Sequence, residues 1–345
     1  MLLFVIMLSR INWESNLTKR IVMGLGLLSI LAFVLGIRQI HSSMWYVFDV
    51  VVIIGTFFCL YEVMKAKKMK SKGIHDYYVY PYIVVAYMLF LLCMLVPGMN
   101  TFWLHVSLQL ILLFVLAIYV FFMAYTDKDF IKKCQVEKQP LGKATRKLTL
   151  QYLGLLIYPA LLLYTLIPLN HMGRFAAFYG DFGTEYASLL GLFSILLVFA
   201  IAAFTDIFCY TVGKILKGPK ICPKISPNKT ITGFIGGLFG GIIGSLVVLL
   251  ALSANGQIQE FLTQRIGNAV AVNLTFIAIG LVGAFITQMG DWYASYIKRK
   301  NDIKDFGTIL PGHGGLMDRF DGIAFNAAFI FFVMMIIVFA VPATI

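Results

Sequence analysis

Nine apolar stretches, each roughly 20 residues long, follow one another along the chain and are separated by polar segments. About 20 apolar residues in a helix are enough to cross the ~30 Å hydrocarbon core of a bilayer. No stretch alternates apolar and polar residues with a period of two, so the strands of a membrane barrel are not indicated. The pattern predicts an all-α protein with about nine transmembrane helices, at residues 21–39, 44–64, 78–97, 102–125, 148–168, 187–213, 231–253, 270–297 and 322–341.

Basic residues between these stretches predict the orientation of the chain. Of the 28 Lys and Arg residues, all but Arg38, Arg174 and Arg265 lie in the N-terminal segment and in alternate loops, namely 65–77, 126–147, 214–230 and 298–321. Basic residues collect in the cytoplasmic loops of membrane proteins. We therefore expect the N-terminus in the cytoplasm and the C-terminus outside. The regular alternation also supports the count of nine.

Composition agrees with a polytopic membrane protein. The chain of 345 residues is 60% hydrophobic with a mean hydropathy of +0.87, whereas soluble domains are about 45–50% apolar. The basic loops account for the net charge of +12 and also attract anionic lipid head groups. No nucleic-acid-binding module accompanies the charge, so we expect no nucleic acid partner. The five cysteines lack the spacing of metal ligands, so we interpret them as small buried hydrophobic residues.

Charged residues and glycines crowd together between the last two apolar stretches. The segment begins at Ser295 with the basic residues Lys298, Arg299, Lys300 and Lys304, continues as Pro-Gly-His-Gly-Gly at 311–315, and closes with Asp318, Arg319 and Asp321. Carboxylates hold Mg²⁺, cations bind phosphate oxygens, and glycines let backbone N–H groups approach them. Beside a membrane, this mixture predicts a site for a polyphosphate and its metal ion.

Helical spacing suggests how the acidic residues converge. Asp291 and Ser295 are four residues apart and share one helix face, while Asp318 and Asp321 are three apart and stack if a helix begins before them. Gly314 and Gly315 permit a tight reversal that brings Asp318 toward Asp291. Two carboxylates from different segments could then bind Mg²⁺ together with phosphate and water. For each acid taken alone, a salt bridge is the alternative.

A second polar group precedes the seventh apolar stretch, where the chain reads Ser226-Pro227-Asn228-Lys229-Thr230. Alone, it predicts a turn followed by an N-capped helix. Asp206 and Tyr210 lie upstream, four residues apart on one helix face, and Asp206, like Asp291, is about two turns from the cytoplasmic end of its helix. For the two acids of the second stretch, Asp49 and Glu62, we expect structural pairing, because unpaired charges are costly in a bilayer.

These motifs together resemble one enzyme family. Ser295, Lys298-Arg299, Lys304-Asp305, Pro311 to Gly315, and Asp318-Arg319 with Asp321 resemble the signature of the CTP-dependent phosphatidate cytidylyltransferases, or CDP-diacylglycerol synthases. Asp206, Tyr210 and the Ser226–Thr230 run are similar to a second motif of that family. The chain departs from the family pattern in two places. Ile231-Thr232 stands where an aromatic residue and Glu are usual, and Ala294 stands where Glu is frequent.

The resemblance implies a function and roles for the motif residues. CTP and phosphatidate would give CDP-diacylglycerol and pyrophosphate at the cytoplasmic face of a bacterial inner membrane, with Mg²⁺ as cofactor; a second metal ion and a homodimer are compatible with it. The catalytic residues would be Asp291, Asp318, Lys304 and Arg319, and the metal ligands Asp291, Asp318 and Asp321. Substrate would contact Asp206, Tyr210, Ser226, Lys229, Thr230, Ser295, Lys298, Arg299, Gly312, His313, Gly314 and Gly315. His313 would donate to phosphate or shape its loop, because an anionic phosphate nucleophile needs no base.

The motifs divide the chain into two regions. Residues 1–186 form an N-terminal membrane region with the first five spans, and residues 187–345 form a catalytic membrane region with the motif loops 214–230 and 298–321. Another CTP-dependent transferase, acting on an isoprenoid or archaeal-type lipid, is one alternative. A transporter of an anionic solute is another, but the chain shows no internal repeat, and its charges cluster at the cytoplasmic edge instead of the midplane.

The predicted orientation can be tested by labelling single cysteines introduced into a variant that lacks the native ones. A cysteine placed in loop 298–321 should react with an impermeant reagent only from the cytoplasmic side. One placed in 254–269 should react only from outside. Reaction of both loops from the same side would contradict the nine-span arrangement.

Overall fold

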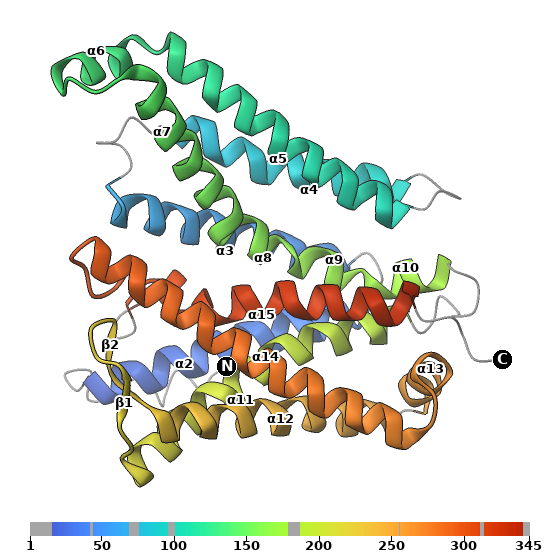
Figure 1. Ribbon diagram of the computed structural model, residues 1–345. Coiled ribbons are helices and arrows are strands. Elements are labelled where there is room, and N and C mark those ends of the chain that lie inside the picture. Colours follow the sequence, from blue (N-terminus) through green and yellow to red (C-terminus); the bar gives the residue numbers. More distant parts are fainter. Residues whose placement is uncertain are drawn as a thin grey trace, which may run out of the picture.

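The computed structural model in Figure 1 describes residues 16–41, 44–68, 76–95, 101–178, 187–254, 256–310 and 314–340, and these residues are mostly helical. The helices are α2 (Asn16–Arg38), α3 (Trp45–Ala66), α4 (Asp76–Leu95), α5 (Thr101–Thr126), α6 (Lys128–Val136), α7 (Leu141–Leu155), α8 (Leu162–Tyr164), α9 (Leu166–Asn170), α10 (Met172–Phe178), α11 (Ala187–Leu216), α12 (Ile231–Ser253), α13 (Gln257–Ile266), α14 (Ala269–Lys300) and α15 (Met317–Met335). Two π-helical segments, Leu156–Leu161 and Ile336–Ala340, extend α7 and α15.

The prediction of an all-α membrane protein is confirmed. Within the described residues, seven helices are long and apolar enough to cross a bilayer, and they coincide with seven of the predicted stretches. Two shorter apolar helical stretches, Gly24–Arg38 and Val79–Cys93, coincide with the first and third. The total of nine spans and the side that each terminus faces remain predictions.

The ends of several helices differ from the predicted boundaries. The fifth span runs from Leu141 to Asn170 and bends at Tyr158, which is extended at φ −122°, ψ 115° because Pro159 follows it. Helix α14 continues to Lys300, and α15 begins at Met317, earlier than predicted. The charged residues Lys298, Arg299, Asp318 and Asp321 therefore lie on helices and not in a loop.

A small β-hairpin departs from the all-α expectation. Strand β1 (Lys220–Cys222) pairs antiparallel with β2 (Ser226–Thr230) in the segment between α11 and α12. The predicted N-cap is confirmed, because the Thr230 hydroxyl accepts a hydrogen bond from the Gly233 N–H at 3.1 Å. The strand was missed because five residues, one of them proline, carry no apolar alternation.

Asp49 is paired inside the structure, as we expected for an acid within a span. It is fully buried, and its carboxylate accepts a hydrogen bond from Asn170 Nδ2 at 2.8 Å and contacts His171 Nε2 at 2.8 Å. Arg38, also fully buried, donates to the Asn170 side chain and carbonyl. This polar cluster joins α2, α3 and α9, and so ties the first helices to the rest of the bundle.

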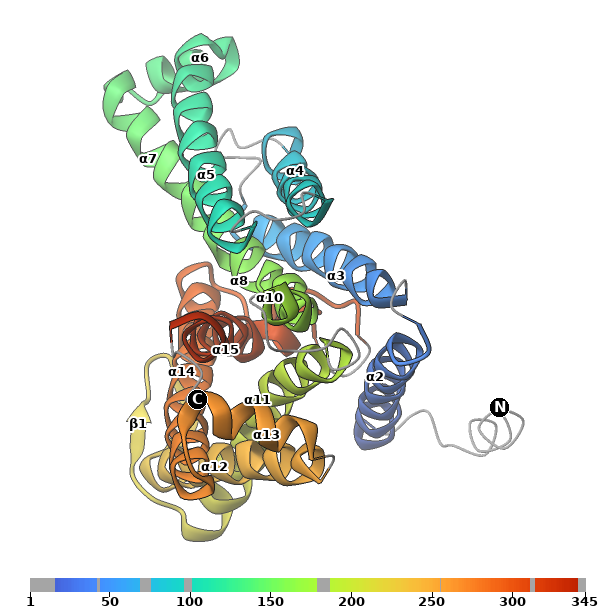
Figure 2. The same ribbon diagram turned by 90° about the vertical axis from the view of Figure 1, so that its right-hand side faces the viewer.

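Glycines let α11, α12 and α14 approach one another closely. If Gly240 carried a side chain, its Cβ atom would lie 2.4 Å from the carbonyl oxygen of Phe204 in α11. A Cβ atom added to Gly244 would lie 2.7 Å from the carbonyl oxygen of Ala200 in the same helix. On the other side of α12, a Cβ on Gly241 would lie 2.6 Å from the Gly280 carbonyl oxygen of α14. Small residues drive helix association in membranes because they allow close backbone contact. Figure 2 shows α11, α12 and α14 grouped together at one end of the molecule, with α4, α5 and α7 at the opposite end.

The glycine contacts predict a selective effect of adding one methyl group. Gly240→Ala should destabilise the protein by about 1–3 kcal/mol, because the methyl group collides with the backbone of α11. Gly55→Ala is the matched control, since no atom lies within 4 Å of a Cβ built there. Thermal unfolding in detergent should show a lowered Tm for the first variant and not for the second. Equal Tm values for the two variants would contradict the close contact between α11 and α12.

Candidate active site

A cavity of about 860 Å³ opens where the C-terminal ends of α11 and α14 meet the N-terminal ends of α12 and α15. The β-hairpin covers part of it, and Figure 1 places that hairpin at the same end of the bundle as α6. Half of the residues that line it are charged: the acids Asp206, Asp291, Asp305, Asp318 and Asp321, and the bases Lys214, Lys217, Lys220, Lys229, Lys298 and Arg319. The mixture suits an anion accompanied by a cation.

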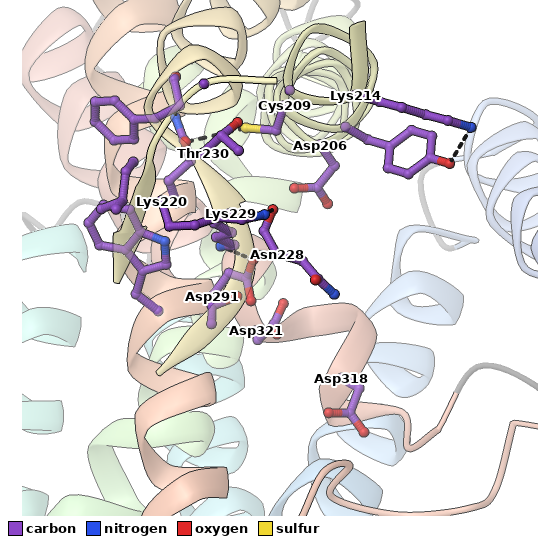
Figure 3. Close-up of a pocket in the computed structure, with 18 of the residues that line it drawn as sticks. Asp206, Cys209, Lys214, Lys220, Asn228, Lys229, Thr230, Asp291, Asp318 and Asp321 are labelled. Atoms are coloured by element: carbon purple, nitrogen blue, oxygen red, sulfur yellow. Dashed lines mark hydrogen bonds and ion pairs between the residues drawn. The ribbon is translucent and has the colours of Figure 1, made fainter. Parts of the chain in front are cut away.

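The crossing of α14 and α15 places Asp291 beside Asp321. A Cβ on Gly290 would lie 2.8 Å from the Asp321 carbonyl oxygen and 3.1 Å from the Cα of Gly322, so the two backbones touch at this point. Asp291, which follows Gly290, is thereby brought to the level of Asp321, which precedes Gly322. Figure 3 shows the carboxylates of Asp291, Asp321 and Asp206 directed into one space, with Asp206 coming from α11.

Lys229 reaches this space from the hairpin. Its ammonium forms an ion pair with Asp291, and its Nζ lies 5.7 Å from the centroid of the Trp292 ring. Phe234 stacks against Trp292 at a centroid distance of 5.6 Å. The side chains of Lys229 and Asp291 remain 27% and 31% exposed, so both are open to the cavity. The aromatic residues hold Lys229 at the wall while its charge stays available to a ligand.

Asp318 has a different environment from Asp291 and Asp321. Its Oδ1 accepts from Lys298 Nζ at 2.8 Å, and its Oδ2 accepts from the N–H groups of Phe306 and Gly315 at 2.9 and 2.8 Å. Its side chain is only 3% exposed. Asp318 therefore organises the loop between α14 and α15. Gly314 completes this arrangement with φ +85°, where a Cβ would also lie 2.9 Å from Asp318 Oδ2.

The donor set fits Mg²⁺ when a substrate supplies further oxygens. Among the described residues, no three Asp, Glu, His or Cys side chains gather closely enough to hold a metal by themselves. Mg²⁺ commonly takes one or two protein carboxylates together with phosphate oxygens and water. Asp291 and Asp321, directed into the cavity, suit this role. The predicted ligand Asp318 suits it less, because its oxygens already accept three hydrogen bonds and Figure 3 shows it set apart.

The structure brings together most of the predicted substrate residues that it describes. Those on the cavity wall are Asp206, Tyr210, Ser226, Lys229, Thr230 and Lys298, and the predicted catalytic residue Arg319 lies on the same wall. Gly314 and Gly315 lie in the loop organised by Asp318. Gly312 and His313 lie outside the described residues.

Three other predicted residues lie away from the cavity wall. Lys304 is exposed on the loop, and Ser295 is buried within α14. Arg299 donates to the carbonyl oxygens of Ile225 and Ile303 at 3.2 and 3.3 Å. Arg299 thus links the end of α14 to the hairpin, because its guanidinium points to backbone carbonyls and not to the carboxylate cluster.

Nothing in the sequence indicated that Lys214, Lys217, Lys220 and Trp292 belong to the wall, and Asn228 and Asp305 were placed in the motifs without a role. The three lysines belong to loop 214–230, whose charge was counted only toward orientation. Thr232 stands where the family usually has Glu. Its hydroxyl accepts a hydrogen bond from the Gly218 N–H at 3.1 Å and so closes the base of the hairpin. Ala294, the other departure, is fully buried and lies off the wall.

Comparison with known proteins links the chain to one family and to bacterial relatives. The family model described as "Cytidylyltransferase family" matches residues 18–337. A protein named phosphatidate cytidylyltransferase from Brucella abortus is 36% identical over 160 residues, which is 45% of this chain and 53% of the relative. One of the same name from Rickettsia felis is 37% identical over 139 residues, or 40% of this chain and 57% of the relative. The chain thus spans about half the length of the curated relatives it matches.

Proposed function

The chain belongs to the cytidylyltransferase family, and on that premise we propose that it transfers a cytidylyl group from CTP to phosphatidate. The products are CDP-diacylglycerol and pyrophosphate. The names of the relatives in Brucella and Rickettsia support this activity. The observation that carries the proposal is the cavity itself, in which Lys229 and Asp291, from motifs far apart in the sequence, form an ion pair beside Asp321.

The reaction requires little acid–base chemistry from the protein. A non-bridging oxygen of the lipid phosphate attacks the α-phosphorus of CTP, and a new P–O bond forms. The bond from the α-phosphorus to the oxygen that bridges to the β-phosphate breaks, and pyrophosphate leaves with the electron pair. The attacking phosphate is already anionic near neutral pH, so no general base is needed. Positioning and charge neutralisation supply the catalysis.

The basic residues of the wall bind the phosphates in this proposal. Lys229 and Lys298, which pair with Asp291 and Asp318, and Arg319 on the same wall contact the triphosphate. Lys214, Lys217 and Lys220 form the outer part and raise the local concentration of the anionic nucleotide. Lys304 and Arg299, which lie off the wall, add to the same positive potential without touching the reacting atoms.

Mg²⁺ is the cofactor that we propose, held by Asp291 and Asp321 with Asp206 facing them. When bound, it offsets negative charge on the triphosphate and on the departing pyrophosphate. We assign Asp318 to hold the loop and Lys298 in place, because Lys298 and two backbone N–H groups already use its oxygens.

The location of the cavity fits a cytosolic nucleotide and a lipid acceptor. Basic residues of segments 214–230 and 298–321 line the cavity, and Figure 1 places α6, from the basic segment 126–147, at the same end of the bundle. We therefore propose that this end faces the cytoplasm of a bacterial inner membrane. The lipid then reaches the site sideways from the inner leaflet, because its acyl chains remain in the bilayer. One chain supplies every residue named in the site, so the proposal holds for a monomer and for a homodimer alike.

Purified protein incubated with CTP, phosphatidate and Mg²⁺ provides the direct test. CDP-diacylglycerol and pyrophosphate should form in equal amounts, and ATP should not replace CTP. Parallel incubations with an isoprenoid phosphate or an archaeal-type lipid as acceptor identify the substrate. Product from one of those acceptors, with none from phosphatidate, would overturn the assignment of phosphatidate while retaining CTP-dependent transfer.

The metal assignment predicts the behaviour of two carboxamide variants. Asp291→Asn and Asp321→Asn should each lower kcat by at least ~10²-fold, a loss of roughly 2.7 kcal/mol in transition-state stabilisation. The double variant should be little worse than either single variant, because both carboxylates act on one ion. Binding of Mn²⁺ in the presence of CTP, measured by electron paramagnetic resonance, should weaken in parallel.

Asp129→Asn serves as the control for these variants. This aspartate is exposed on α6, away from the cavity, and its substitution should leave turnover and Mn²⁺ binding near wild type. Folded Asp291→Asn protein with near-normal turnover would reject the metal site, and Asp291 would then be a structural partner of Lys229.

A further inference from the structure

Glu62 connects the N-terminal half of the molecule to the cavity loop. It lies in the last turns of α3 and is 2% exposed. Its Oε1 accepts from the Leu316 N–H at 3.0 Å, and its Oε2 accepts from the Met317 N–H at 2.8 Å. These two N–H groups belong to the start of α15, where backbone donors have no partner within the helix. A side chain from the second predicted span therefore caps the helix that carries Asp318, Arg319 and Asp321.

The loop between α14 and α15 is shaped around this carboxylate. A Cβ on Gly307 would lie 2.3 Å from Glu62 Oε1, and one on Gly315 would lie 2.5 Å from Glu62 Oε2. For both glycines, the three atoms nearest to that Cβ all belong to Glu62. Neither glycine has a positive φ, so backbone conformation does not explain them. The space that each glycine leaves is the space that Glu62 fills.

Two carboxylates thus hold the loop. Asp318 accepts from the N–H groups of Phe306 and Gly315, while Glu62 accepts from those of Leu316 and Met317. Asp318 also holds Lys298 on the cavity wall. Removal of Glu62 would leave the buried Met317 N–H and the partly buried Leu316 N–H without their acceptor and would open a gap beside the two glycines.

We propose that Glu62 is a positioning residue for the cytidylyl transfer. It fixes the loop and the first turn of α15, and through them it keeps Lys298, Arg319 and Asp321 in their places on the cavity wall. The carboxylate itself acts through these neighbours. The expected effect on kinetics rests on the proposed function. The role of Glu62 in holding the loop does not depend on that function.

Hydrogen–deuterium exchange of the full-length protein in lipid nanodiscs tests the structural part. In Glu62→Gln, the side chain keeps one acceptor oxygen and turns an NH₂ group toward the other backbone donor. Exchange at the amides of Leu316 and Met317 should become at least ~10-fold faster, while peptides from α11 and α12 stay unchanged. Glu137→Gln, at an exposed glutamate following α6, is the matched control and should exchange like wild type. Unchanged exchange at Leu316 and Met317 in Glu62→Gln would overturn the proposal.

Kinetics separate positioning of the site from a general loss of stability. In Glu62→Gln, the KM for CTP should rise by about 10-fold while the KM for phosphatidate stays within about twofold, because the displaced loop carries nucleotide-binding groups. A merely less stable protein would lose active enzyme and lower the apparent kcat with both KM values unchanged, and that result would overturn positioning. If wild-type protein makes no CDP-diacylglycerol, the proposed function fails, and the exchange measurement still decides whether Glu62 holds the loop.

A double-variant cycle tests the contact itself. Gly307→Ala should lower kcat/KM for CTP by about 10-fold, because the new methyl group collides with Glu62. In a Glu62→Ala background, the same substitution should cost little, since the colliding carboxylate is gone. Additive losses from the two substitutions would contradict the fit between Glu62 and the loop.

Discussion

Direct backbone contact at glycines is the constraint on which the site depends. Lipid tails are as apolar as leucine side chains, so helices in a bilayer gain little from hiding apolar surface and associate through close packing. A Cβ on Gly213 would lie 3.2 Å from the Cα of Gly233, so the end of α11 touches the start of α12. The contact between Gly290 and Gly322 does the same for α14 and α15. These two contacts bring four helix ends together and leave the cavity between them.

The carboxylates divide into two groups according to their partners. Asp49, Glu62 and Asp318 are buried, and each accepts two or more hydrogen bonds from the protein. Asp206 and Asp291 are directed into the cavity beside Asp321. Burying a charge is costly unless the protein supplies partners, so the first group holds the fold and the loop together. In the second group, Asp291 pairs with Lys229, and all three carboxylates face the cavity, where a ligand can reach them.

Much of the fold could be predicted from the sequence, because the length of an apolar stretch and the charge of its flanking loops reflect the bilayer directly. The N-cap at Thr230 and the convergence of the two motifs were also predictable from local residue types. The motifs indicated Asp291, Asp318 and Asp321 together as metal ligands. They could not show that Asp321 lies at the level of Asp291, because the contact at Gly290 depends on where two helices cross. The structural pairing expected of Glu62 is confirmed, but its partners could not have been named, since they lie more than 250 residues away.

A structure of the protein determined with CTP and Mg²⁺ in the absence of lipid tests the central claim most directly. The account predicts density for the triphosphate in the cavity, in contact with Lys229 and Arg319, and a metal ion bound by Asp291 and Asp321. A nucleotide bound elsewhere, or a metal ion held by Asp318 with Lys298 displaced, would contradict it.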